Sequence, residues 1–136
     1  MAVQNFYNAY FLVNSINLSD HVKSIKFDSK VDTLEVTAMS NPEHRFIQGL
    51  KDITFEVTMY QDYASGSVDA TLNTLLTAGA VAFETRPDAG AVAVTNPKWT
   101  GNLIFEGYEP ISGSVGTVQE ISAKFRPAGA ITRATA

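Results

Sequence analysis

The sequence of 136 residues is notable first for the groups that it lacks. It contains no cysteine, which excludes disulfide bonds, thiolate nucleophiles, cysteine-based zinc sites and iron–sulfur clusters. Its longest apolar runs, such as residues 9–13, are far shorter than the roughly 20 residues that a membrane-spanning helix needs. The first residues lack the basic start and apolar middle of a secretory signal. We therefore expect no membrane span, no export signal and a fold that depends on packing alone.

Concentrated positive charge is also missing. The formal net charge is -4, and the ten basic residues are scattered singly from Lys23 to Arg133. A protein that holds nucleic acid regardless of base sequence needs a cationic surface that neutralises phosphates. This pattern argues against tight binding of DNA or RNA.

Catalytic and metal-binding motifs are absent too. The two histidines, His21 and His44, follow the acidic residues Asp20 and Glu43, but neighbours on a strand point to opposite faces, so neither pair is preorganised for acid–base chemistry. Ser67 lacks the surrounding glycines of a nucleophile elbow and fits better as a helix N-cap. No metal-ligand spacing occurs. We expect no enzymatic activity, no metal site and no cofactor.

What is present is the periodicity of β-strands. Residues 53–59 alternate strictly between apolar and polar side chains, which predicts a strand with one buried face. The other strand candidates are residues 7–13, 22–28, 33–37, 81–85, 91–95, 102–108 and 118–125. So many short strands in one chain predict a sandwich or barrel, formed as a single domain over residues 1–136.

One helix interrupts the strand pattern. Its apolar face is formed by Val68, Leu72, Leu75 and Leu76, at helical spacing. Ser67 is the expected N-cap, and Gly79 supplies the expected end. We expect this helix to lie across the sheet with its apolar face inward.

Two segments carry little periodicity. Residues 29–50 are expected to form a long loop whose apolar members, Leu34, Val36, Met39, Phe46 and Ile47, favour contact with a neighbouring subunit. Arg45 beside Phe46 adds an arginine–aromatic pair of the kind that is enriched in interface cores. The tail, residues 130–136, is expected to be mobile unless a partner fixes it.

Read together, several short sequence segments make the chain resemble the tail tube (major tail) proteins of long-tailed bacteriophages over most of its length. None of these segments is a catalytic motif, and the resemblance depends on their order and spacing. They are NLSDHV at residues 17–22, TAM at 37–39, GLKD at 49–52, YQDY at 60–63, SVDA at 67–70, NPKWTG at 96–101, GSVG at 113–116 and FRPAG at 125–129.

The resemblance implies a β-sandwich or half-barrel with one flanking α-helix. It implies a structural virion protein that assembles into stacked hexameric rings, which form the hollow tail tube through which the genome passes. Expected partners are further copies of the chain, a tape-measure protein and tail-end proteins. DNA would pass without tight binding, and the protein would be found in the virion tail and, during assembly, in the host cytoplasm.

Two sets of residues are expected to matter in such a tube. The polar faces of two strands are predicted to line the lumen, through Thr54, Glu56, Thr58, Glu120, Ser122 and Lys124. Contacts between subunits and between stacked rings are predicted for Leu34, Val36, Met39, Arg45, Phe46 and Ile47.

Other functions remain open at this point. A tail terminator, a tail completion protein or a baseplate ring protein would share the fold. A carbohydrate-binding β-sandwich module would account for the aromatic residues, which could line a sugar-binding face. A small hydrolase has the least support, because no acid–base constellation is evident.

Overall fold

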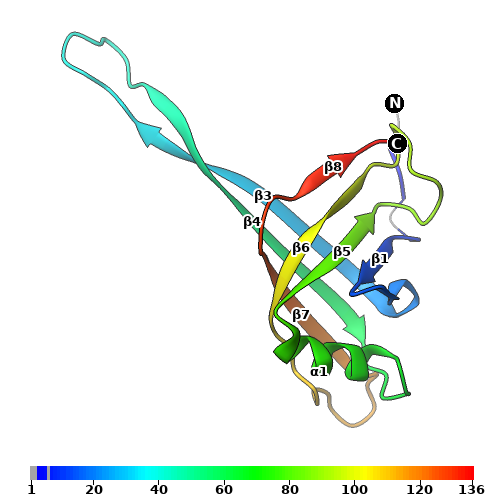
Figure 1. Ribbon diagram of the computed structural model, residues 1–136. Helices are drawn as coiled ribbons and strands as arrows, with labels where there is room; N and C mark the ends of the chain where they lie inside the picture. The colour runs from blue at the N-terminus through cyan, green and yellow to red at the C-terminus, as the bar shows by residue number, and fades with distance from the viewer. Residues whose placement is uncertain (1–2, 6) are drawn as a thin grey trace.

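The computed structural model describes residues 3–5 and 7–136. It is mainly β, with a single antiparallel sheet in the order β2-β1-β5-β6-β7-β4-β3 and with β8 paired to β6 (Figure 1). The elements in chain order are β1 (Tyr10–Val13), β2 (Ile16–Asn17), the 3-10 turn η1 (Ser19–His21), β3 (Val22–Glu35), β4 (Phe46–Tyr60), α1 (Val68–Ala78), β5 (Ala80–Arg86), β6 (Lys98–Gly107), β7 (Glu120–Pro127) and β8 (Thr132–Ala134).

The sheet is rolled rather than flat. Phe11 on β1 and Phe125 on β7 have ring centroids 6.2 Å apart, whereas strands three places apart in a flat sheet are about 14 Å from one another. Phe27 on β3 and Trp99 on β6 are likewise 5.9 Å apart. The sheet therefore closes over its own inner face, which confirms the expected half-barrel with one flanking helix.

The inner face and α1 form the core. The expected alternation over residues 53–59 is confirmed, since Phe55, Val57 and Met59 are fully buried within β4. The other strands supply further buried side chains, namely Phe11, Val13, Val81, Phe83, Leu103, Phe105, Ile121, Ala123 and Phe125. Val68, Leu72 and Leu75 of α1 complete this cluster from the helix.

The helix spans the expected residues, but two details differ. Leu76 is 51% exposed, and the fourth buried position is Thr71. Ser67 makes no side-chain capping bond; its hydroxyl instead donates to Asp62 Oδ2 over 2.8 Å. Gly79 ends the helix with a φ of +72°.

Among the described residues, no helix has the length and hydropathy that crossing a membrane requires.

The prediction of a long loop at residues 29–50 is wrong. β3 continues to Glu35 and β4 begins at Phe46, so that most of the segment is a two-stranded hairpin with residues 36–45 as its tip. The expected strand at residues 33–37 merges into β3. Figure 1 shows this hairpin projecting far from the rest of the sheet. We call residues 29–51 the hairpin arm.

Two further expectations are corrected. Residues 91–95 form no named strand, because the chain turns back at an isolated bridge between Ala93 and Asn96. The tail is not free: Thr132–Ala134 pairs with Lys98–Thr100 of β6, and Ile131 packs against the core. Backbone pairing within the same chain thus orders the tail.

Candidate functional site

The six residues that were expected to line a lumen lie together on the sheet face opposite the core. They are Thr54, Glu56, Thr58, Glu120, Ser122 and Lys124. Each of them has a buried core residue next to it along β4 or β7, so the pleat turns all six outward. The register sets Glu56 opposite Lys124 and Thr58 opposite Ser122. The structure brings these residues together; that they face a lumen stays a prediction.

Charges on this polar face are arranged in complementary pairs. Glu56 lies in register between Lys26 of β3 and Lys124 of β7, and opposite charges facing each other across strands stabilise a sheet by roughly 0.2–1 kcal/mol. Lys23 Nζ contacts Glu120 Oε1 at 2.8 Å, and this hydrogen bond raises the pKa of Lys23.

Arg126 extends the pattern on β7. Its Nε lies 2.6 Å from Glu106 Oε1, and its Nη1 lies 3.5 Å from Asp52 Oδ1. The bond to Glu106 raises the pKa of the Arg126 guanidinium. Because these cations each face a carboxylate, the face offers no concentrated positive surface to a passing polyanion.

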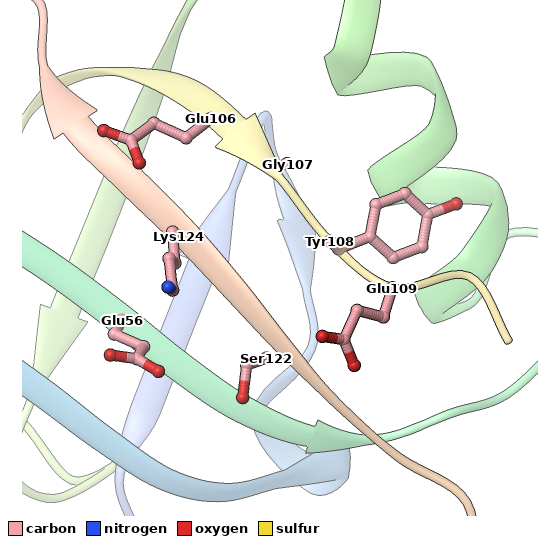
Figure 2. A pocket seen from close by; sticks show the side chains of 7 residues that line it. All are labelled: Glu56, Glu106, Gly107, Tyr108, Glu109, Ser122 and Lys124. Atoms are coloured by element: carbon pink, nitrogen blue, oxygen red, sulfur yellow. The ribbon is translucent and has the colours of Figure 1, made fainter. Parts of the chain in front are cut away.

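A shallow hollow of about 390 Å³ lies on the same face (Figure 2). Three carboxylates line it, from Glu56, Glu106 and Glu109, together with Lys124 and Ser122. Figure 2 shows Tyr108 turned away toward α1, where its hydroxyl donates to Asp69 Oδ1 over 3.0 Å. Over the part of the chain that the structure describes, no group of three or more acidic or histidine side chains is placed to hold a metal ion. The hollow is therefore a mildly acidic part of the polar face.

The six residues that were expected at subunit contacts all lie on the hairpin arm. They are Leu34, Val36, Met39, Arg45, Phe46 and Ile47. Met39 at the tip is 97% exposed and Phe46 is 59% exposed. Covering such side chains is worth roughly 1.5–3 kcal/mol each. The arm thus holds unburied apolar surface that its own domain does not cover.

A β-bulge arranges the apolar groups on both faces of the arm. The register shifts between Val31 and Thr33, so that Leu34 comes opposite Ile47 while Glu35 comes opposite Phe46. Successive pairs point to opposite faces. Gly49 sits at the bulge, where a Cβ would lie 3.3 Å from Asp32 Cβ.

The sequence reasoning missed two exposed apolar residues of the arm, Val31 and Leu50. Leu50 is 81% exposed on the arm, and its position beside Gly49 in a strand of broken alternation was the available signal. An arm with apolar groups on both faces is suited to lie between two partner surfaces.

The structure also brings together a polar cluster that the sequence reasoning did not foresee. His21 Nε2 lies 2.9 Å from Asp62 Oδ2, across 41 residues of chain, and His21 Nδ1 lies 3.0 Å from Asp20 Oδ1. The expectation that Asp20 and His21 point apart is wrong because they lie in η1 rather than in a strand.

This cluster is not arranged as a nucleophile with its base. Both nitrogens of His21 face carboxylates, and the Ser67 hydroxyl donates to Asp62. The Ser67 hydroxyl also lies 3.4 Å from His21 Nε2, but the shorter 2.8 Å bond directs it to Asp62 rather than to a base that would activate it as a nucleophile. Three groups hold the pKa of Asp62 below its usual value: the Ala64 backbone N–H first, then Ser67 and His21. The cluster ties η1 to the start of α1.

Comparison with known proteins gives matches by structure. No protein-family model matches the chain, and no curated protein matches it by sequence. A chain of the native gene transfer agent (GTA) virion superposes with a TM-score of 0.77 at 13% identity, covering 96% of this chain and 98% of that chain. A chain from the tail of the empty GTA particle, refined with C6 symmetry, gives 0.68 at 14% identity, with coverages of 85% and 83%.

Other phage-like assemblies contain the same fold. A chain of the SPP1 tail tube matches with a TM-score of 0.71 at 14% identity, covering 95% of this chain and 77% of that chain. A chain of the anti-feeding prophage (AFP) baseplate gives 0.59 at 10% identity, with coverages of 98% and 97%. The fold that the sequence resemblance predicted is thereby confirmed: this chain has the fold found in the GTA tail and in the SPP1 tail tube.

Proposed function

We propose that this chain is the structural subunit of a phage-type tail tube, which assembles into hexameric rings that stack into a hollow conduit for the genome. The observation that carries the proposal is the fold match, over almost the whole chain, to chains of the GTA virion and the SPP1 tail tube. The C6 symmetry of the GTA tail supports six subunits in a ring. The protein would belong to the virion tail and would be assembled in the host cytoplasm.

Ring formation has a physical basis in the edges of the sheet. β3 and β2 end the strand order, so each has one side without a neighbouring strand in the described chain. Unpaired N–H and C=O groups on such an edge template association with another strand. We propose that these edges join neighbouring subunits into a continuous sheet around the ring, because closure removes exposed edges.

The polar face is proposed to line the lumen. Its small hydroxyls and its paired charges, such as Lys23 with Glu120, present no concentrated positive charge to phosphates. DNA would therefore pass without being held. A tape-measure protein and tail-end proteins are proposed as further partners of the tube.

The hairpin arm is proposed to make the contacts between subunits and between stacked rings. Its apolar groups lie on both faces, and its reach beyond the domain (Figure 1) lets it insert between neighbours. This role needs no catalytic residues. A purely structural, non-enzymatic role is therefore part of the proposal.

Imaging the purified chain tests the proposal directly. Negative-stain electron microscopy is expected to show six-membered rings and tubes, with sedimentation showing large particles. The double variant Arg45→Glu with Phe46→Ala should unfold like the wild type yet form no stacked tubes. Val94→Ala, at a residue 79% exposed in the loop before β6, is the matched control and should form normal tubes. A chain that stays monomeric at high concentration would refute the function.

A baseplate ring protein is the second candidate, and the match to the AFP baseplate chain favours it. Such a protein would form one ring without stacking, so the same images distinguish it from a tube subunit. The carbohydrate-binding alternative has less support. Of the aromatic residues that could line a sugar-binding face, Phe11 and Phe105 are buried in the core and Trp99 packs against Phe27, whereas Tyr7 and Tyr63 are exposed.

A further inference from the structure

The two ends of the sheet differ in how they are protected against foreign strands. At one end, β3 carries six charged side chains, which are Lys23, Lys26, Asp28, Lys30, Asp32 and Glu35. At the other end, β2 has only two residues, so that β1 is the last full strand. Residues 1–19 contain no acidic or basic side chain. Charged side chains commonly keep an edge strand from pairing with another chain, and β1 lacks this protection.

β1 also has the composition of an aggregation-prone segment. Residues 9–13 read Ala-Tyr-Phe-Leu-Val and combine high hydrophobicity and β-propensity with no charge and no proline. A segment of this kind favours the addition of further strands when its edge is open. Figure 1 shows β1 at the side of the sheet away from the hairpin arm. An open edge at β1 would therefore compete with the ring contacts for other copies of the chain.

The chain that follows β2 closes this edge. β2 itself covers Leu12 and Val13 through strand pairing. Next along β1, the Phe11 N–H donates to Ser19 Oγ over 2.8 Å, and the Phe11 carbonyl accepts from the Leu18 N–H over 3.1 Å. Both backbone groups of Phe11 are thus bonded within the chain, and a foreign strand finds no free N–H there.

Several contacts hold Ser19 in position. Asn17 Oδ1 accepts from the Ser19 N–H at 2.9 Å and from its hydroxyl at 2.5 Å, which leaves the hydroxyl oxygen free to accept from β1. The side chain of Leu18 is buried in the core. The His21 N–H donates to the Leu18 carbonyl over 3.0 Å, and the His21 ring contacts Asp62. The His21 cluster therefore anchors the segment that covers β1.

We propose that residues 17–21 form an edge plug, an autoinhibitory contact that closes β1 to strand addition by other copies of the chain. The inference goes beyond the proposed function, because it concerns association that does not lead to rings. An N–H that is already bonded within the chain gains little from a foreign strand, whereas an unpaired one is stabilised by it. The plug leaves β2 and β3 as the open ends of the sheet, which are the ends proposed for the ring.

Ser19→Ala tests the plug on monomers kept below the concentration at which tubes form. Hydrogen exchange of the Phe11 amide should accelerate by roughly fivefold or more, the factor that corresponds to a lost hydrogen bond of about 1 kcal/mol. Aggregates that bind thioflavin T should form several-fold faster than in the wild type. Ser19→Thr keeps a hydroxyl and should behave like the wild type. Wild-type rates of exchange or of aggregation in Ser19→Ala would overturn the proposal.

Two further variants separate an opened edge from a general loss of stability. Tyr108→Phe removes another partly buried hydrogen bond, from the Tyr108 hydroxyl to Asp69, without opening a strand, and should aggregate like the wild type. Tyr7→Lys adds a charge beside the apolar run, at a residue that is 83% exposed. Combined with Ser19→Ala, it should suppress aggregation while the Phe11 amide still exchanges fast. Equal aggregation of Tyr108→Phe and Ser19→Ala, or no suppression by Tyr7→Lys, would contradict the plug.

Asn17→Ala provides the measurement if Ser19→Ala does not fold. It keeps the Ser19 hydroxyl but removes the group that orients it, so both readouts should rise by less than in Ser19→Ala, and wild-type behaviour would overturn the proposal. These outcomes are distinguishable from those of the proposed function. A wild-type chain that forms no rings would refute the function alone, whereas normal tubes together with an unchanged Ser19→Ala monomer would refute the plug alone.

Discussion

The aromatic rings of Phe11 on β1 and Phe55 on β4 stack with centroids 5.6 Å apart and planes inclined by 30°, although three strands separate β1 from β4 in the sheet. Phe55 also contacts Phe27, Phe83 and Phe125 at centroid distances of 5.5 to 5.8 Å. A single side chain thus joins the two halves of the rolled sheet. The half-barrel depends on this aromatic cluster as well as on strand pairing.

Replacing Phe55 with alanine should therefore be among the most damaging single changes. We expect Phe55→Ala to lower the free energy of unfolding by about 3–5 kcal/mol, since a large buried ring leaves a cavity. Urea unfolding of the monomer measures this. Phe46→Ala on the same strand is the control: its ring is 59% exposed, so its loss should cost under about 0.5 kcal/mol. A comparable loss from both variants would place the arm in the core.

The attachment of the tail can be tested at Gly101. A Cβ at this position would lie 2.8 Å from Ile131 Cδ1 and 3.0 Å from the Ala130 backbone oxygen. Gly101→Ala should push the tail away from β6 and cost about 1–3 kcal/mol, as overpacking does. Hydrogen exchange of the Thr132–Ala134 amides should accelerate. Gly90→Ala is the control, because a Cβ there would have its nearest neighbour, Asp88 Oδ2, at 3.6 Å. Slow hydrogen exchange of the tail amides in the Gly101→Ala variant would contradict the expectation.

Strand positions and the helix could be predicted from the sequence because their periodicity is intact. Residues 53–59 alternate strictly and pack one face on the core, and α1 occupies the predicted turns. The arm could not be predicted in this way, since the bulge at Val31–Thr33 shifts the side chains by one position and obscures the alternation. Residues 91–95, which include the β-branched Val92, Val94 and Thr95, were expected to form a strand yet form no named one.

Long-range side-chain contacts explain the remaining errors. The side chain of Asn96 accepts from the Asp88 N–H and donates to the carbonyls of Asp88, Gly90 and Ala91, which holds the preceding segment in a loop. Such a network has no periodic signal. The same holds for the candidate site. Alternation placed Glu56 and Lys124 on outward faces, but the position of Glu56 between Lys26 and Lys124 depends on the order of strands in the sheet.

The His21–Asp62 cluster predicts an acid-dependent loss of stability. The pKa of Asp62 lies below its ordinary value of 3.8, because the Ala64 N–H, the Ser67 hydroxyl and His21 all favour the charged form. A group with a lowered pKa in the folded state stabilises the fold above its ordinary pKa, and this contribution disappears as the pH falls through the folded value. The loss should therefore begin at about pH 5, a little above the ordinary pKa, and continue as the pH falls further.

Asp62→Asn provides the measurement. The variant should be less stable than the wild type near neutral pH, and the gap should narrow as the pH falls from about 5 toward 2. Urea midpoints recorded across this range give the comparison. Asp32→Asn, at an exposed residue of the arm, is the control, and its gap to the wild type should remain small throughout. A gap at Asp62 that is constant with pH would exclude the carboxylate as its source.

The lumen assignment can be tested by adding positive charge at one position of the polar face. Glu56→Lys is expected to slow DNA passage, but it would place three ammonium groups in a row, because Glu56 lies between Lys26 and Lys124. Thr58 is the cleaner site, since it lies between Ser24 and Ser122 in the register. Thr58→Lys should leave monomer stability and tube formation close to the wild type.

Tubes of the Thr58→Lys variant should bind short duplex DNA, because six added cations in each ring would line the conduit and release counterions from phosphates. Binding should weaken steeply as salt is raised, and DNA held in the lumen should resist nuclease, whereas DNA held on the outside should be digested. Ala91→Lys adds the same charge in the exposed loop before β6 and is the matched control. Salt-sensitive binding with nuclease protection only for Thr58→Lys would support the assignment. Digestible DNA on those tubes would place Thr58 on the outer wall, and with it the whole polar face of β4 and β7.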